Sequence, residues 1–516
     1  MAIALLRPSS PLYEVRLDIA SRGVAVAIAL LLLFQAGIVV CVGRVIGASL
    51  APFDEYSVST GGPWGYDNDQ YAHVADALLA GRLTLDLPVA ESLRGLPNPY
   101  DTAARSETLS AAGEYFYMDY AYYQGSYYSY FGVLPALISY APFKLLTGRN
   151  LPNAPVALAY GITLSCAIAA AFYRLYRRFF NEANLGAYLT VELAAFFGCG
   201  IVYLTCLPTL YSVPILLGLT LVHAAIWCWL GAADGLHTRG SLSKPYLLAG
   251  GICGGLTILC RPLYVLVALV AVGLFWREVF RDRLFFSRKG LGNTLCVMVP
   301  FVAVGCIAMA YNYARFGSPL DFGAAYNLTG EDMTARHFVL ARVPACLFEY
   351  LFQPLTVTTA FPYVHLTTME ADFQGIWFFE PYVGGFFALS PVALFAFGAF
   401  RKKDAALDDA CRPLALVCWV IAMVIAVADF TVASITQRYH SDFAWALLIC
   451  AALVIWSRWQ RPETPAAYKS VVVGLLFLGA FLVGLAEFAP GTYVDMAHGC
   501  PTLYYFVKYQ LFGLLL

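Results

Sequence analysis

Long apolar blocks separated by short polar stretches make up most of this chain. The blocks run for roughly 18 to 25 residues, the length that an α-helix rising about 1.5 Å per residue needs to cross the hydrocarbon core of a membrane. The pattern therefore predicts an all-α polytopic membrane protein with about 11 transmembrane helices. We place these helices at residues 23–47, 153–173, 186–206, 209–230, 246–260, 262–276, 292–312, 383–400, 413–430, 440–457 and 470–488.

The composition supports the same class of protein. Hydrophobic residues account for 60% of the 516 positions and charged residues for 13%, which is about half of the ~25% charged residues in an ordinary globular protein. A water-soluble core could not bury that much apolar surface. A formal net charge of −1 offers no electrostatic attraction to a nucleic acid, so we exclude nucleic-acid partners.

Most of the 14 cysteines fall inside the apolar blocks, where cysteine behaves as a small hydrophobic residue. This placement argues against a disulfide framework or a zinc site. Only Cys346 and Cys500 lie where we expect extracytoplasmic loops, and a bond between them stays open.

Arginine and lysine positions set the predicted orientation, because these residues gather on the cytoplasmic side of membrane proteins. Arg7, Arg16 and Arg22 lie in the stretch 1–22 before the first block, which places the N-terminus in the cytoplasm. A cluster of arginines at 174–178 follows the second predicted span and marks a return to the cytoplasm. With the spans above, the later basic clusters also face the cytoplasm, at 239–244, 277–289, 401–403 and 458–469.

The apolar stretch 130–146 has to remain on the outer face for this count to hold. It contains Pro135, Pro142 and Lys144 and follows a run of tyrosines, which favour the membrane–water interface. We interpret it as a juxtamembrane or re-entrant segment. The chain then divides into membrane regions at 23–47, 153–312 and 383–488, two large extracytoplasmic loops at 48–152 and 313–382, and an extracytoplasmic tail at 489–516.

Two aspartates, Asp67 and Asp69, lie early in the first loop. Residues 71–79 then place apolar side chains at helical spacing, which predicts a short helix on the outer membrane surface. A helix dipole stabilises a carboxylate at its N-terminus by ~0.3–1 kcal/mol, so the aspartates could simply cap this helix. Alternatively, one of them is a catalytic base at the interface, where a lipid-linked substrate presents its head group.

Residues 67–75 read DNDQYAHVA. This segment resembles the pattern D-E-x-x-Y-A-x-x-A that the C-type (GT-C) superfamily of membrane glycosyltransferases carries just after its first span. That superfamily includes protein O-mannosyltransferases and the aminoarabinose transferases of lipid A. Asp67 takes the place of the first acid, whereas Asn68 stands at the second and the carboxylate follows at Asp69. The departure leaves open which aspartate acts, and it weakens an inferred metal site.

Three further segments resemble members of the same superfamily. Residues 127–137 look like the proline-containing juxtamembrane segment late in the first loop, in agreement with the orientation derived from the basic residues. The other two segments resemble parts of uncharacterised bacterial members and lie at 312–320 and 437–443.

The resemblance implies a GT-C-like bundle and the activity of an inverting glycosyltransferase. Such an enzyme moves a sugar from a polyprenyl-phosphate donor to an envelope glycan, lipid or protein acceptor on the extracytoplasmic face of the plasma (inner) membrane. Asp67 or Asp69 would remove the proton of the acceptor hydroxyl. The resemblance fixes no cofactor, and the need for a divalent metal stays open.

A phosphate leaving group calls for a basic residue on the outer face that neutralises its charge. Arg261 and Arg438 lie at the outer ends of predicted spans and are our candidates to bind the donor phosphate. Both could equally be interfacial arginines whose side chains reach the lipid head groups. Arg315 is a weaker third candidate, since exposed loop arginines are common.

Five other residues are candidate contacts to the acceptor or the sugar: Tyr71, His73, Tyr127, Tyr128 and His440. Tyrosines stack on sugar faces, although an aromatic belt at the interface explains them equally well. An interfacial histidine is more often a hydrogen-bonding surface residue than a base.

The alternative function is a transporter or flippase of lipid-linked glycans without covalent chemistry. It predicts paired charges within spans and broken helices at matching positions of two halves. The sequence shows single charges, among them Glu192 and Asp429, for which it indicates no partner. The long first loop with its carboxylates near the membrane surface favours the enzyme, and an inactive scaffold of an envelope complex also stays open.

Overall fold

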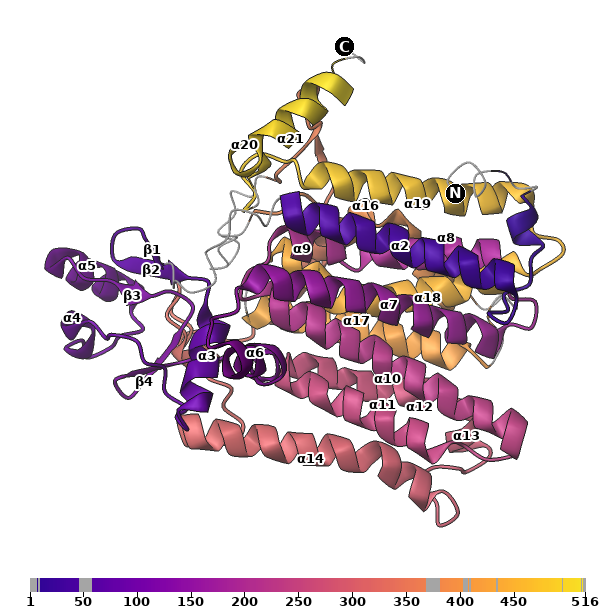
Figure 1. The fold of residues 1–516 in the computed structure, drawn as a ribbon, viewed down its shortest axis with the longest axis horizontal. Coiled ribbons are helices and arrows are strands. Elements are labelled where there is room, and N and C mark those ends of the chain that lie inside the picture. The colour runs from indigo at the N-terminus through magenta and orange to yellow at the C-terminus, as the bar shows by residue number, and fades with distance from the viewer. Residues whose placement is uncertain are drawn as a thin grey trace.

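The computed structural model of the chain describes residues 7, 10–45, 58–367, 381–401, 407, 410–432, 435–493, 495–511 and 513. Parts of the two predicted loops, at 46–57 and 368–380, lie outside the described residues. The long helices run side by side, and the elements of the first loop gather at one end of the bundle, which we call the loop end (Figure 1).

Seven helices among the described residues are long and apolar enough to cross a membrane. Each coincides with a predicted span, which confirms a mainly helical membrane protein in outline. They are α2 (Arg22–Val45), α7 (Asn153–Phe179), α10 (Ser212–Arg239), α14 (Leu291–Phe316), α17 (Arg412–Val432), α18 (His440–Trp459) and α19 (Ala466–Ala486).

The other four predicted spans hold shorter or broken helices, so a count of 11 stays a prediction. The first of these spans, 186–206, breaks at Gly200. Its φ of 80° lies in a region that glycine adopts readily, and the Cβ of any other residue there would lie 2.0 Å from Ser441 Oγ. Proline begins two of the short 3₁₀ helices, at Pro262 and Pro391. The elements are α8 (Leu185–Gly198), α9 (Ile201–Cys206), α11 (Lys244–Leu256), η4 (Thr257–Leu259), η5 (Pro262–Leu266), α12 (Val267–Leu274), α13 (Trp276–Phe280), α16 (Phe386–Leu389) and η8 (Pro391–Phe400).

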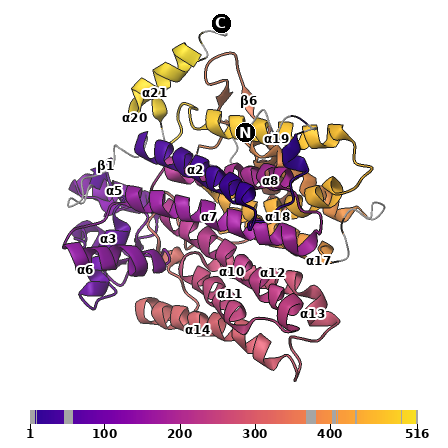
Figure 2. The same cartoon turned by 45° about the vertical axis from the view of Figure 1, so that its right-hand side comes forward.

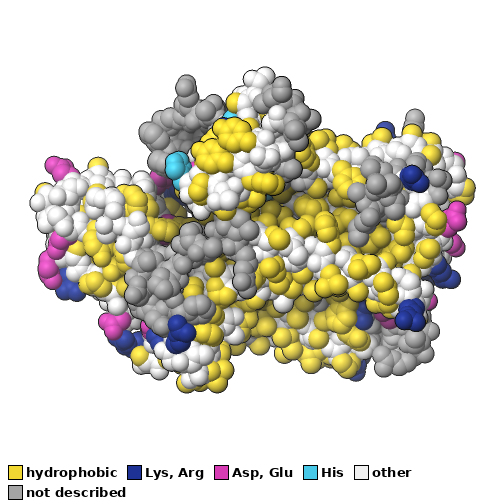
Figure 3. All heavy atoms as spheres, turned by 45° about the horizontal axis from the view of Figure 1, so that its top comes forward, with side chains coloured by type: hydrophobic (Ala, Val, Ile, Leu, Met, Phe, Trp, Pro, Cys, Tyr) yellow, Lys and Arg dark blue, Asp and Glu magenta, His cyan; other side chains and the backbone are white. Residues whose placement is uncertain are grey.

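The side of the bundle is apolar. Figure 3 shows a broad band of hydrophobic side chains between two ends at which the charged side chains gather. Only 28% of the apolar stretch of α14 is buried inside the protein, and 22% of that of α2, against 94% for α18. Helix α14 also lies at the edge of the bundle in two views (Figures 1 and 2). Lipid is the solvent that suits these exposed faces.

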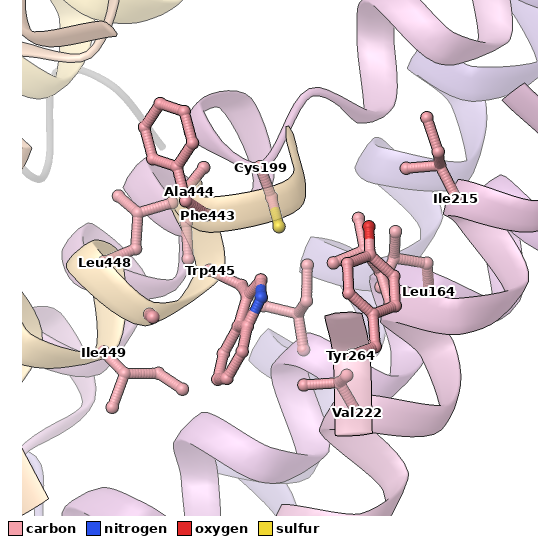
Figure 4. Close-up of a cluster of buried hydrophobic side chains, with 14 of the residues drawn as sticks. Leu164, Cys199, Ile215, Val222, Tyr264, Phe443, Ala444, Trp445, Leu448 and Ile449 are labelled. Atoms are coloured by element: carbon pink, nitrogen blue, oxygen red, sulfur yellow. The ribbon is translucent and has the colours of Figure 1, made fainter. Parts of the chain in front are cut away.

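The centre of the bundle is packed from several elements. Trp445 of α18 and Tyr264 of η5 lie close to side chains of α7 and α10, with Cys199 between them (Figure 4). Helix α18 is buried along almost its whole length because it packs against α17, α8 and η8. Residues at the loop-end terminus of α18 are therefore held rigidly.

The first loop forms a small sheet and a set of short helices. Strand β2 (Trp64–Asp67) pairs antiparallel with β1 (Val58–Thr60) and parallel with β3 (Phe116–Tyr117), and β4 (Ala121–Tyr123) pairs with β5 (Ser126–Tyr128). The predicted surface helix is present as α3 (Gln70–Leu79). The remaining helices of this loop are α4 (Glu91–Arg94), α5 (Thr102–Ala112), η3 (Ala136–Tyr140) and α6 (Ala141–Thr147).

The stretch 130–146 forms no helix of spanning length, since η3 and α6 have 5 and 7 residues. Both pack against α3. Gly132 lies directly against the backbone at the end of η4, where an added Cβ would be 2.2 Å from Leu259 O. This close approach brings the first loop to the turn that carries Arg261.

The second loop is hydrogen-bonded to the first. Leu328 exchanges two backbone hydrogen bonds with the turn at Asp119 and Tyr120, and Arg105 donates to Thr329 O at 2.5 Å. Cys346 and Cys500 are free thiols, so the bond left open above is absent. The elements of the second loop are η6 (Ala324–Tyr326), η7 (Leu340–Arg342), α15 (Val343–Phe352), β6 (Thr356–Val357) and β7 (Val364–His365). Those of the C-terminal region are α20 (Met496–Gly499), α21 (Pro501–Phe506) and η10 (Val507–Leu511). Two short 3₁₀ helices remain, η1 (Pro11–Tyr13) before α2 and η9 (Gln437–Tyr439) before α18.

The orientation in the membrane remains a prediction that labelling can test. Helix α7 spans 27 residues, or about 40 Å, so Arg149 and Asn181 lie beyond its opposite ends. An impermeant thiol reagent added from outside should label Arg149→Cys and should miss Asn181→Cys. The unsubstituted chain gives the background from its own cysteines, and outside labelling at Asn181→Cys would contradict the orientation.

Candidate functional site

Asp67 ends strand β2 and lies at the centre of a buried hydrogen-bond group. Its Oδ2 is 3.0 Å from the hydroxyl of Tyr120, which donates to it, and 2.9 Å from Nε2 of His73. Its Oδ1 accepts from the backbone N–H of Asp69 at 2.8 Å. We call Asp67, His73 and Tyr120 the aspartate centre.

Tyr120 serves this centre as a hydrogen-bond donor. Its side chain is fully buried, and burial, followed by the charge of Asp67, raises the pKa of Tyr120 well above its usual value. The phenol therefore stays protonated and keeps donating to Asp67.

Asp67 and His73 of the aspartate centre line a cavity of about 370 Å³. Among the other lining residues, Arg82 pairs with Asp86 at 3.1 Å, and Asp76 pairs with Lys144 of α6. These side chains offer both charged and hydrogen-bonding groups to a polar molecule. The complete lining consists of Val58, Asp67, His73, Asp76, Arg82, Asp86, Leu87 and Tyr117.

The structure explains the departure from the family pattern at Asn68. The side chain of Asn68 accepts from the backbone N–H of Leu210 at 2.9 Å and donates to Pro208 O at 3.5 Å. Only an amide can do both, because a carboxylate cannot donate. Asp69 occupies the N-cap position of α3 but makes no side-chain capping bond, so capping does not account for either aspartate.

A second group of charges lies at the loop end of the bundle. Arg261 donates to Asp442 Oδ2 at 2.5 Å, and the hydroxyl of Tyr264 donates to Asp442 Oδ1 at 2.5 Å. Asp429 lies 4.0 Å from the Arg261 guanidinium and thereby gains the partner that the sequence did not indicate. Burial of these charges is tolerated because they are paired.

Arg438 joins this group through aromatic rings. Its guanidinium lies 3.9 Å from the ring centroid of Tyr211 and 5.1 Å from that of Tyr439. Arg261 lies 5.1 Å from the Tyr439 ring as well, so the two predicted arginines flank a single tyrosine. We call Arg261, Arg438 and Asp442 the arginine centre.

One turn connects the two centres. Tyr120 contacts Asp67, while the preceding residue, Asp119, accepts a hydrogen bond from the hydroxyl of Tyr211, on whose ring Arg438 lies. Asp119 has a φ of 63°, which is uncommon for a residue other than glycine and marks positions of special local constraint. The Asn68–Leu210 bond is a second connection, because Leu210 precedes Tyr211.

The other predicted contacts lie outside these two centres. Tyr71 is buried and stacks on Tyr140, Tyr127 is buried among other tyrosines, and Tyr128 packs on Phe316. Tyr71 and Tyr127 are part of the buried core of the loop region, and Tyr128 is half-buried beside it.

His440 lies in an aromatic environment. Its ring is buried among Tyr350, Phe386 and Phe443, with centroid distances of 5.8, 6.3 and 5.9 Å. Its Nε2 has no hydrogen-bond partner in the structure. The residue packs the second loop onto the start of α18.

Arg315 is not an exposed loop residue. It lies in the last turn of α14 and is buried, where it donates to Ser129 O and to Asn312 Oδ1. It therefore fixes the first loop to α14. Glu192, the other carboxylate noted within a span, accepts two bonds from Gln35 Nε2, at 2.8 and 2.7 Å.

Sequence reasoning missed Asp119, Tyr120, Tyr211 and Asp442. A partial signal existed for Asp442, since a carboxylate and an arginine that lie in separate spans are expected to pair. No local pattern marks the other three. In the part of the chain that the structure describes, no three His, Cys, Asp or Glu side chains gather as a metal-binding group.

Comparisons with known proteins add little. No family model and no curated protein matches the chain. The chain is similar to the crystal structure of the Archaeoglobus fulgidus oligosaccharyltransferase in the apo form, with a TM-score of 0.44 and 12% identity. The match covers 90% of this chain and 56% of that one. A likeness of this degree shows no shared function.

The position of Asn68 leads to a testable prediction. Asn68→Asp restores the acid of the family pattern but places a second acceptor against Pro208 O. Loss of the donated bond should lower the free energy of unfolding by ~1–3 kcal/mol, measured by thermal unfolding in detergent. Unchanged stability would show that this contact does not hold the two segments together.

Proposed function

We propose that this protein is an inverting glycosyltransferase of GT-C type in the plasma (inner) membrane. It takes a sugar from a polyprenyl-phosphate donor and delivers it to an envelope glycan, lipid or protein acceptor on the extracytoplasmic face. One observation carries the proposal: a buried Asp–His pair on a polar cavity is connected through a single turn to two arginines at the end of an apolar bundle.

The two centres suit the two halves of such a reaction. The aspartate centre takes the proton of the acceptor hydroxyl, which makes the oxygen a better nucleophile. That oxygen forms a bond to the anomeric carbon while the bond from this carbon to the phosphate oxygen breaks. The phosphate leaves with the electron pair, and a guanidinium stabilises its charge by charge-assisted hydrogen bonds.

The two arginines differ in what they are able to do. The charge of Arg261 is offset at close range by Asp442, whereas Arg438 lies against the ring faces of Tyr211 and Tyr439. A guanidinium presents a planar fork of N–H groups that matches the geometry of a phosphate, and its plane can also stack on an aromatic ring. We assign the donor phosphate to Arg438, because Tyr211, on whose ring it lies, is bonded to the turn that carries Tyr120. We assign a positioning role to Arg261, because Asp442 holds it.

A transporter or flippase of lipid-linked glycans is the second candidate. Two observations favour it: Arg261 and Asp442 are paired charges from separate spans, and Gly200 breaks a helix. Neither observation requires the Asp67 centre or its cavity. Transfer of labelled sugar by the purified protein separates the two functions.

The central prediction concerns Asp67. Asp67→Asn turns an amide toward His73 and Tyr120, so sugar transfer should fall by ~100-fold or more, while donor binding stays normal. Asp69→Asn is the matched control and should keep transfer within about tenfold, because Asp69 is not part of the aspartate centre.

Both variants are assayed with a radiolabelled polyprenyl-phosphate sugar, after thermal unfolding has verified folding. A stability loss of ~1–3 kcal/mol is expected for Asp67→Asn, because buried hydrogen bonds are disturbed. If both single variants and the double variant transfer sugar at the normal rate, the base lies elsewhere.

A further prediction separates the arginines. Arg438→Ala should raise the KM for the donor by about 10- to 100-fold, as expected for a lost charged hydrogen bond, with little loss of stability. Arg261→Ala should instead destabilise the fold by ~3–5 kcal/mol, because the buried carboxylate of Asp442 loses its close counter-ion. The double variant Arg261→Met/Asp442→Leu should recover that stability. A normal donor KM in Arg438→Ala would remove this residue from the site.

A further inference from the structure

We propose that Tyr130 is a further side chain at the donor phosphate, where its hydroxyl donates a hydrogen bond to the phosphate oxygen that parts from the sugar. The assignment rests on the proposed transfer reaction and deepens it. It gives the leaving oxygen a hydrogen-bond donor of its own, in addition to the positive charge that Arg438 supplies.

The backbone on both sides of Tyr130 is fixed. Ser129, which precedes it, accepts a hydrogen bond from Arg315 of α14 through its backbone oxygen. Gly132, which follows, lies so close to the turn before Arg261 that a Cβ added there would be 2.2 Å from a backbone oxygen. Tyr130 is therefore held between α14 and that turn.

Ring contacts lead from Tyr130 to the arginine centre. The centroid of the Tyr130 ring lies 4.2 Å from that of Phe131, and the Phe131 ring meets the Tyr211 ring edge-on with 5.5 Å between their centroids. The guanidinium of Arg438 lies over the same Tyr211 ring, 3.9 Å from its centroid. Tyr130 therefore belongs to the same packed group as the arginine that we assign to the phosphate.

The charges that act on Tyr130 are those of the arginine centre and of the turn at Asp119. Burial, followed by the charge of Asp119, raises the pKa of Tyr130 well above its usual value. Tyr439 raises it as well, whereas Arg438 and Arg261 lower it. Because the raised pKa keeps the phenol protonated, Tyr130 serves as a hydrogen-bond donor and does not give up its proton.

Among the described residues, the hydroxyl of Tyr130 has no hydrogen-bond partner. The two buried tyrosines nearest to the connecting turn differ in this respect, since Tyr120 donates to Asp67 and Tyr211 donates to Asp119. Tyr130 is half-buried, and a hydroxyl taken out of water without an acceptor costs free energy. A phosphate oxygen beside the arginine centre is an acceptor that would satisfy it.

The step balances without a proton on the leaving phosphate. The acceptor proton passes to the aspartate centre as the acceptor oxygen bonds to the anomeric carbon. The bond from this carbon to the phosphate oxygen breaks, and its electron pair stays on that oxygen. The oxygen thereby gains negative charge and accepts a stronger, charge-assisted hydrogen bond from Tyr130. Because this bond strengthens as the phosphate departs, it favours the transition state over the bound donor.

Removal of one hydroxyl tests the assignment. In the full chain, reconstituted in lipid nanodiscs, Tyr130→Phe should lower kcat for transfer from a polyprenyl-phosphate sugar by ~10- to 100-fold. The KM for the donor should change little, because the bond forms mainly in the transition state. Thermal unfolding verifies that the variant folds.

Tyr123→Phe is the matched control. Tyr123 is a half-buried tyrosine of the same loop, its hydroxyl likewise has no hydrogen-bond partner among the described residues, and its ring packs on Tyr326 with 4.5 Å between centroids. It lies outside the arginine centre, so its variant should transfer sugar at the normal rate. A loss of kcat equal to that of Tyr130→Phe would contradict the assignment.

Binding at equilibrium distinguishes a phosphate contact from a structural role. Farnesyl phosphate, a short polyprenyl phosphate with the charge of the departing product, should bind Tyr130→Phe ~10- to 100-fold more weakly than the wild-type protein. Farnesol, which has no phosphate, should bind both proteins equally. A residue that only supports the fold would weaken the binding of both ligands alike.

Two results overturn the assignment alone: a normal kcat in Tyr130→Phe, or an equal loss of affinity for farnesyl phosphate and farnesol. Absence of transfer by the wild-type protein with every donor and acceptor class refutes the proposed function, and this assignment with it.

Discussion

The turn that carries Asp119 and Tyr120 is the constraint on which the loop end depends. Asp119 is held at a φ of 63°, a conformation that costs of order 1–3 kcal/mol outside glycine. Its surroundings maintain it: Leu328 bonds to the turn on both sides, and the Gln70 amide donates to Asp119 O at 3.0 Å. The turn directs one side chain to each centre, and a shift in it would disturb both together.

Buried charges impose a second constraint. An unpaired ion inside an apolar bundle costs several kcal/mol, and its attraction to a partner offsets this cost only in good geometry. The arginine centre meets that requirement through Arg261, Asp442 and the hydroxyl of Tyr264. Because α18 is almost wholly buried, Asp442 in its first turn and Arg438 in the adjoining η9 have little freedom to move. The bundle thereby provides a fixed frame, on which the first loop is fastened by Asn68 and Arg315.

Local sequence patterns predicted the features that depend on residues close together in the chain. Apolar blocks gave the seven long helices, helical spacing gave α3, and Asp67 and His73 lie only six residues apart. Contacts between distant residues had no such signal, and Tyr120 and Asp67 are separated by 53 positions. A high density of tyrosines in the sequence is typical both of a surface that stacks on sugars and of a packed aromatic core. In the structure Tyr127 is buried in such a core. The burial of His440 against Tyr350 of the second loop had no local signal either.

We propose that a lipid-linked phosphate binds beside the arginine centre, within reach of the aspartate centre. Photo-crosslinking with a polyprenyl phosphate that carries a diazirine next to its phosphate locates this phosphate on the chain. In the reconstituted protein, mass spectrometry should find the label on peptides covering 208–212, 261–264 or 437–443. Label confined to 174–184 and 277–291, at the opposite end of the bundle, would contradict it.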